Sequence, residues 1–327
     1  MNIKKHLLIG LLSLIVVGGI ILIVSGAANH HVNDDRPSVV VTSFVAYDSV
    51  RQIAGGKVNL QNLLSPGVEK HSYDPSPSDI IRIRNADLFI YVGGDIEGWT
   101  ARVLETVGTE NTKVLRLMEA INLIEKENNY YHGHSHNHHS SSHSHHHHHD
   151  EAEVDEHIWT SPANAILIIN LITDKLVELM PEHEEIFVEN ANEYILEIKE
   201  LQNEIISVVE SASRRHLVFG DRMPMQYFLN EFGLRASAAF SGCGVHVEPS
   251  ARVISDLVSV VRSENIPVVL HLEMSNGRIA RTIADEVGIE IMQIHSMHNI
   301  SRTEFENGET YVSLMRKNLE VLKVALN

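Results

Sequence analysis

Short β-branched and apolar runs alternate with amphipathic segments twice along this chain, and this alternation predicts an α/β fold. The expected strands span residues 38–44, 57–64, 88–92 and 113–117 in the first half, and 216–219, 235–240, 268–272 and 290–295 in the second. Strands that alternate with helices pair in parallel through right-handed crossovers. We therefore predict two similar lobes with parallel sheets, over 38–180 and 214–327.

Two long helical patterns lie between the predicted lobes. Pro162 suits the first turn of a helix over 163–179, and Pro181 ends it. The next helix, expected over 184–212, carries an apolar stripe that includes Ile198 and Leu201. At 1.5 Å per residue it would reach roughly 40 Å. This length predicts a rigid helix that joins the two lobes.

Composition narrows the class of protein. A chain of 327 residues has room for two hydrophobic cores, and 43% hydrophobic with 21% charged residues is typical of a globular protein. The formal net charge of −17 argues against non-specific nucleic-acid binding, which needs a basic surface. Cys243 is the single cysteine, so an internal disulfide and a multi-cysteine zinc site are excluded.

The first 28 residues predict a membrane-targeting element. Lys4 and Lys5 precede an uncharged apolar run over 7–24, which is followed by small residues at 25–28. Such a run fits either a cleaved signal peptide or a retained membrane anchor. Both alternatives place the rest of the chain outside the cytoplasm. No cysteine lies directly after the apolar run, so we do not expect a lipoprotein anchor.

Eleven of the 22 histidines fall in one tract, within a segment over 130–153 that is rich in His, Ser, Asn and Gly. This composition buries too little apolar surface to offset chain entropy, so we expect disorder without metal. Closely spaced imidazoles can collect a metal ion loosely, and an inert spacer is the alternative.

Two isolated histidines lie in short segments that contain prolines, and they are stronger candidates for ligands of a defined metal site. His71 lies in Pro-Gly-Val-Glu-Lys-His-Ser-Tyr-Asp-Pro-Ser-Pro-Ser-Asp over 66–79, and His157 lies in Asp-Glu-His-Ile-Trp-Thr-Ser-Pro over 155–162. Proline fixes φ and removes a backbone donor, which holds a loop in a defined shape. A metal ligand needs such a loop because coordination tolerates little positional error.

The two motifs, P-G-x3-H-x-Y-x-P-x-P-x-D and D-x-H-x-W-x-x-P, together resemble the metal-binding solute receptors of zinc and manganese ABC importers. The likeness runs from Val39 to the C-terminal helix and includes Glu248-Pro249-Ser250 and the histidine-rich insertion. It implies a monomeric receptor outside the cytoplasm, with metal held between two lobes and passed to a membrane permease. It implies no enzymatic activity.

The resemblance also implies a ligand set. His71 and His157 match the motif, and Asp155 is expected to accept a hydrogen bond from the second ring nitrogen of His157. His295 lies where the family usually carries an aspartate ligand, and His298 is an alternative from the same loop.

The fourth position departs from the family. Its usual third histidine aligns with Arg222, which cannot coordinate a cation. We therefore expect Asp221 as the fourth ligand, with water or Cys243 as alternatives. Three imidazoles with one carboxylate or water favour Zn²⁺ over Mn²⁺, although copper and nickel also bind such ligands.

Two other classes of function remain open from the sequence. A zinc hydrolase could use three histidines and an open coordination position to activate water. The chain contains no H-E-x-x-H motif and no clear general base beside the expected ligands. A metal-linked surface adhesin is the other alternative, and it would not require a permease.

Overall fold

The structure, a computed structural model, describes residues 35–68, 73–110, 112–125, 154–240 and 248–327. The predicted targeting element, the histidine tract and Cys243 lie outside these residues. Within the described ranges, no helix combines the length and the apolar character needed to cross a bilayer.

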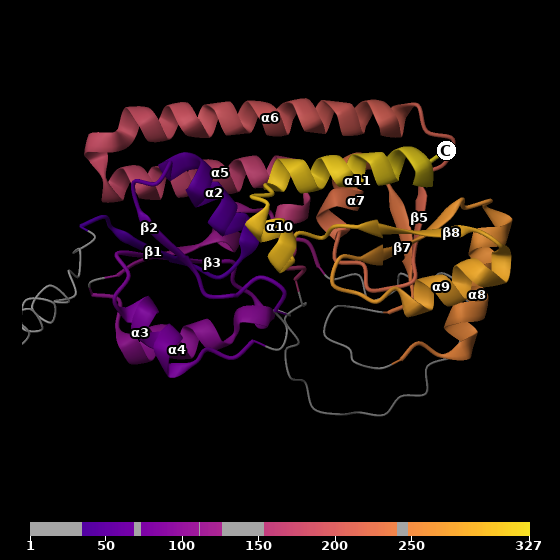
Figure 1. Cartoon of the computed structure of the whole chain (residues 1–327), viewed down its shortest axis with the longest axis horizontal. Coiled ribbons are helices and arrows are strands. Elements are labelled where there is room, and N and C mark those ends of the chain that lie inside the picture. The colour runs from indigo at the N-terminus through magenta and orange to yellow at the C-terminus, as the bar shows by residue number, and fades with distance from the viewer. Residues whose placement is uncertain (1–34, 69–72, 111, 126–153, 241–247) are drawn as a thin grey trace, which may run out of the picture. The chain divides into compact units, whose positions relative to one another are not determined.

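The N-terminal lobe is built on a parallel sheet with strand order β2-β1-β3-β4. Its strands are β1 (Ser38–Val41), β2 (Asn59–Asn62), β3 (Leu88–Tyr91) and β4 (Lys113–Arg116). Helices α3 (Pro77–Arg84) and α4 (Trp99–Val107) cover one face, and α2 (Phe44–Ala54) and α5 (Pro162–Leu179) cover the other (Figure 1). Because both faces are covered, Val39, Val40 and Val41 of the central strand are fully buried.

The C-terminal lobe repeats this plan with strand order β6-β5-β7-β8, again all parallel. Its strands are β5 (His216–Phe219), β6 (Arg235–Ala238), β7 (Val268–Leu272) and β8 (Glu290–Ile294), and its helices are α7 (Gln226–Phe232), α8 (Ala251–Ser263), α9 (Arg278–Val287), α10 (Arg302–Glu306) and α11 (Tyr311–Ala325). Two parallel-sheet lobes with equivalent strand orders confirm the predicted fold class.

Helix α6 (Glu184–Glu210) runs along both lobes (Figure 1). It packs against α5 and α2 of the first lobe and α11 of the second. Its stripe includes Ile198, Leu201 and Ile205, which are fully buried. One hydrophobic cluster extends from β1 through this stripe to β8. The lobes therefore share a core, which restricts movement of one lobe against the other.

The observed elements differ from the predicted ones at two places, and in both a helix begins there. Strand β1 ends at Val41 instead of residue 44, because Ser43 caps α2 by accepting a hydrogen bond from the Ala46 N–H. Helix α10 was not among the predicted elements. Its signal was present, since Ser301 and Glu304 form a capping box.

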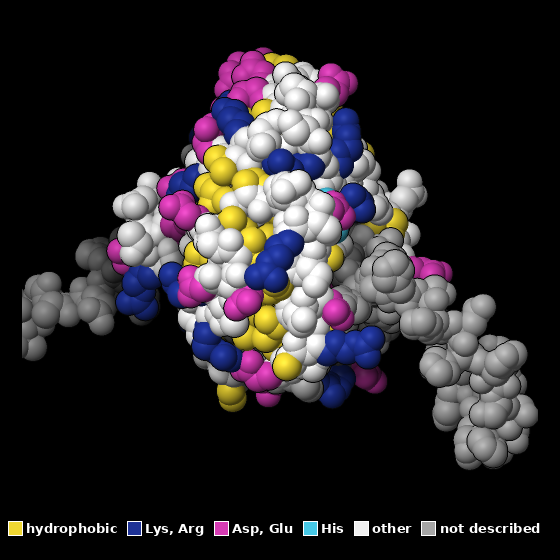
Figure 2. Space-filling view, turned by 90° about the vertical axis from the view of Figure 1, so that its right-hand side faces the viewer, with side chains coloured by type: hydrophobic (Ala, Val, Ile, Leu, Met, Phe, Trp, Pro, Cys, Tyr) yellow, Lys and Arg dark blue, Asp and Glu magenta, His cyan; other side chains and the backbone are white. Residues whose placement is uncertain are grey.

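The outer face of the C-terminal lobe carries Lys, Arg, Asp and Glu side chains side by side (Figure 2). Hydrophobic side chains form a band between them. The acidic excess of the chain therefore does not form a single-sign field on this face, and we assign no charged ligand to it.

Candidate metal centre

His157 lies at the start of a 3-10 turn (Ile158–Thr160) that leads into α5, and its side chain is only 2% exposed. Asp155 Oδ1 accepts the backbone N–H of His157 at 2.7 Å and lies 2.8 Å from its Nδ1. A proton on Nδ1 is thereby favoured, which puts the imidazole lone pair on Nε2. Asp155 makes the contact expected of it from the sequence.

The ring of His298, from the loop after β8, meets His157 edge to face with centroids 5.2 Å apart. Two imidazoles bound to one tetrahedral Zn²⁺ at Zn–N distances of about 2.0–2.1 Å have centroids roughly 5 Å apart. The two histidines come from different lobes and lie at a separation that suits a shared metal ion.

Trp159 holds these two segments together. Its ring centroid lies 5.5 Å from that of His157 and 5.4 Å from that of His298. Its Nε1–H donates to the carbonyl of Ser296 at 2.9 Å, across the lobe boundary. A buried indole therefore fixes the spacing between the two histidine-bearing loops.

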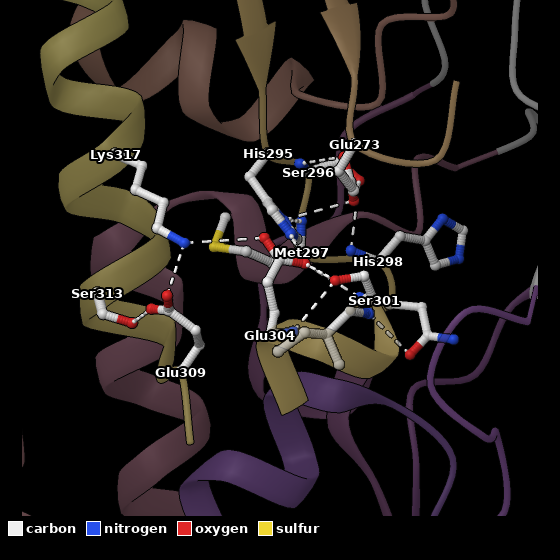
Figure 3. A network of polar contacts seen from close by, with 12 residues as sticks. Glu273, His295, Ser296, Met297, His298, Ser301, Glu304, Glu309, Ser313 and Lys317 are labelled. Carbon is white, nitrogen blue, oxygen red and sulfur yellow. Dashed lines mark hydrogen bonds and ion pairs between the residues drawn. The ribbon is translucent and has the colours of Figure 1, made fainter. Parts of the chain in front are cut away.

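His295, the residue predicted from its position after the last strand, lies in a separate polar network (Figure 3). Its side chain is 3% exposed, and its Nδ1 accepts the Met297 N–H at 2.9 Å. Its Nε2 lies 3.6 Å from Glu304 Oε2. The ring of His298 points away from this network. The loop thus directs its two histidines into different surroundings.

The polar network around His295 changes the pKa of Glu304. The His295 imidazole lowers the pKa of the Glu304 carboxyl to about 2, and the Ser301 hydroxyl and backbone N–H contribute. A carboxylate that stays ionised in a largely covered position beside His295 holds the imidazole towards α10 and away from His157.

Asp221, the predicted fourth ligand, follows β5 and contacts backbone. Its Oδ1 accepts the Arg222 N–H at 2.8 Å, and its Oδ2 accepts the Leu272 N–H at 3.4 Å. It also lines a small pocket with Glu248 and Arg278. Both of these hydrogen bonds are with backbone N–H groups, and neither involves His157 or His298.

His71 and Cys243 lie outside the described residues. Among the residues that are described, no three His, Cys, Asp or Glu side chains are arranged to hold one ion. The segment before His71 is described up to Val68, whose carbonyl accepts a hydrogen bond from Asn299 at 2.8 Å. Val68 therefore lies beside the loop that carries His298.

Comparison with known proteins identifies the family. The family model for the zinc-uptake complex component A, periplasmic, matches residues 39–325. The chain belongs to this family. The match confirms the resemblance inferred from the two proline-containing motifs, and it favours a transport receptor over a zinc hydrolase.

Individual family members are distant relatives. The chain is 28% identical over 297 residues to the high-affinity zinc uptake system protein ZnuA of Bacillus subtilis, which covers 89% of this chain and 88% of that protein. It is 27% identical over 316 residues to the zinc-binding lipoprotein AdcA of Streptococcus pneumoniae, covering 95% of this chain. It spans 60% of the length of that relative.

Solved structures of the family have the same fold. The Zn(II)-bound ZnuA-like domain of Streptococcus pneumoniae AdcA superimposes with a TM-score of 0.72 at 25% identity, covering 89% of this chain and 99% of that chain. A laminin-binding protein of Streptococcus agalactiae has a TM-score of 0.73 at 22% identity, covering 89% of this chain and all of that chain. The second likeness shows the fold alone and gives the adhesin alternative no further support.

Proposed function

We propose that this protein is an extracytoplasmic receptor that binds Zn²⁺ with high affinity and delivers it, as a monomer, to the permease of an ABC importer. Family membership supports zinc uptake as the process. The observation that supports a metal centre between the lobes is the 5.2 Å separation of the His157 and His298 ring centroids.

We infer that His157, His298 and His71 hold the ion. Asp155 orients His157, and His298 faces it from the other lobe. His71 is included on its motif, and the described chain leading to it lies against the His298 loop. A water molecule or a further side chain would complete a tetrahedral set.

This ligand set replaces His295 with His298. His295 Nδ1 already accepts a backbone hydrogen bond, and the ring faces Glu304. Coordination through Nδ1 would break that bond, and coordination through Nε2 would require the ring to leave its carboxylate neighbour. Asp221 is likewise better placed to secure the backbone that follows β5 than to join His157.

Zinc affinity of single variants tests this ligand set. His298→Ala should weaken binding by more than the roughly 10–100-fold cost of losing an outer-sphere partner, because an inner-sphere bond is lost. His295→Ala should lower the stability of the apo-protein and have the smaller effect on affinity. His183→Ala, whose ring packs on Phe187 away from the site, is the matched control.

Competition against a chromophoric chelator gives the affinities, and circular dichroism verifies the fold of each variant. If His295→Ala abolishes tight binding while His298→Ala binds as the parent does, the proposed register is wrong. Growth of a strain lacking this protein in chelator-treated medium then tests delivery. The parent and His183→Ala should restore growth, and His298→Ala should not.

A further inference from the structure

Asn299, next to His298, is buried and fully hydrogen-bonded. Its side chain is 2% exposed. Nδ2 donates to the carbonyl of Ser65 at 2.9 Å and to the carbonyl of Val68 at 2.8 Å, and Oδ1 accepts the Ile300 N–H at 2.8 Å. Both N–H donors of the Asn299 side-chain amide are therefore hydrogen-bonded to a loop of the N-terminal lobe.

A backbone hydrogen bond closes the same contact from the opposite direction. The N–H of Gly67, an exposed residue, donates to the carbonyl of Ile300 at 2.8 Å. We call these four hydrogen bonds the Asn299 clasp. It connects the loop after β2, which leads towards His71, with the loop after β8, which carries His298.

The chemistry of the clasp requires an amide. Asparagine offers two N–H donors and an acceptor oxygen, and the clasp uses all of them. Aspartate has no donor and would face two carbonyl oxygens with a charge. Alanine would leave the Val68 and Ser65 carbonyls to water and the Ile300 N–H without its acceptor.

We propose that Asn299 is a positioning residue for zinc binding, which acts by holding the loop that carries His298 in a fixed position against the loop after β2 in the apo-protein. This role rests on the proposed function, because it presumes that His298 binds the ion. With the clasp formed, the loops are already adjacent when zinc arrives. Without it, only a fraction of molecules has both loops in place, and the apparent affinity falls by that fraction.

The test compares zinc affinities at a temperature where circular dichroism shows every variant folded. Asn299→Ala should weaken zinc binding by about 10–100-fold, as loss of an outer-sphere partner does. Asn299→Ser, which keeps one hydroxyl donor, should fall between Ala and the parent. Asn190→Ala is the matched control, because Asn190 Nδ2 also donates to a backbone carbonyl, that of Ile53, but between α6 and α2. Its zinc affinity should equal that of the parent.

A double-mutant cycle separates positioning from general loosening. In a His298→Ala background, Asn299→Ala should change the remaining zinc affinity by no more than about twofold, because the ligand it positions is gone. An undiminished effect in that background, or an equal effect of Asn190→Ala, would overturn the proposal. If His298→Ala weakens zinc binding and Asn299→Ala does not, the clasp inference fails and the ligand set stands. If His298→Ala has no effect, the ligand set itself fails.

Hydrogen exchange keeps the proposal testable should Asn299→Ala not fold. In the apo form of the parent, the amide of exposed Gly67 should exchange slowly because it donates to Ile300, and Asn299→Ser should speed its exchange. Free exchange of the Gly67 amide in the parent would overturn the proposal.

Discussion

Asp48 is a buried carboxylate that contacts three helices, and its removal should lower the free energy of unfolding of the protein. Its side chain is fully buried in α2. It accepts the Tyr194 hydroxyl of α6 at 2.5 Å, the Tyr311 backbone N–H of α11 at 2.7 Å and the Arg51 guanidinium at 2.6 Å. One carboxylate thus connects the N-terminal lobe, the long helix and the C-terminal helix.

The cost of Asp48→Ala follows from the donors that it leaves behind. The Tyr194 hydroxyl and the Tyr311 N–H belong to residues that are 5% and 2% exposed, and each buried donor without an acceptor costs about 1–3 kcal/mol. Arg51 contributes less, because its side chain is 30% exposed and also donates to the Glu309 carbonyl. The expected loss is about 3–5 kcal/mol of unfolding free energy. Asp48→Asn keeps the shape and one acceptor oxygen, so it should cost roughly half as much.

Equilibrium unfolding of the apo-protein in urea measures this loss. Asp256→Ala is the control, since Asp256 lies on the surface of α8 and its carboxylate is 3.7 Å from Arg252. That exposed pair should contribute less than about 1 kcal/mol. A change below about 1 kcal/mol for Asp48→Ala, with an unchanged dependence on urea, would refute the claim that this carboxylate holds the three helices together.

Three further predictions concern pH and metal. Zinc affinity should fall as pH drops through about 6.5, because each imidazole must be neutral to coordinate. The fall should be steeper than one proton per zinc ion. An affinity that stays flat from pH 5 to 8 would exclude a histidine-dominated site. The pKa of Glu304 is lowered from 4.5 to about 2, so its contribution to stability is present above pH 4.5 and is lost as pH falls towards 2. The stability difference between the parent and Glu304→Gln should shrink over that window in urea unfolding at pH 5, 4 and 3. Deletion of residues 132–149 should leave about one tightly bound Zn²⁺ by elemental analysis, and loss of tight binding would refute separate tight and loose sites.

The fold could be predicted from the sequence because its signals are local. A β-branched run such as Val39–Val41 predicts a buried parallel strand from its own residues, and helices do cover both faces of that strand. The stripe that includes Ile198 and Leu201 likewise predicts one packed face of a long helix. Where a predicted boundary was wrong, as at the end of β1, a helix cap decides it, and the cap residue Ser43 is present in the sequence.

The candidate site was harder to predict, because it depends on contacts between distant segments. His295 and His298 are both plausible ligands from sequence, and the choice between them follows from partners far along the chain. Glu304 lies on α10, which was not predicted. The backbone of His295 is held by Asn318, whose side chain donates to the His295 carbonyl and accepts its N–H. None of these partners is indicated by the residues next to His295.

The direction of His298 has a physical cause in the residue before it. Met297 is fully buried and has φ of 56°, in the left-handed region that costs a residue with a side chain about 1–3 kcal/mol. The His295 imidazole accepts the N–H of this strained residue, and Glu273 accepts both the N–H and the hydroxyl of Ser296. These hydrogen bonds offset the strain and fix the backbone between the two histidines. In the proposed ligand set, these contacts make His295 part of the frame that positions His298 opposite His157.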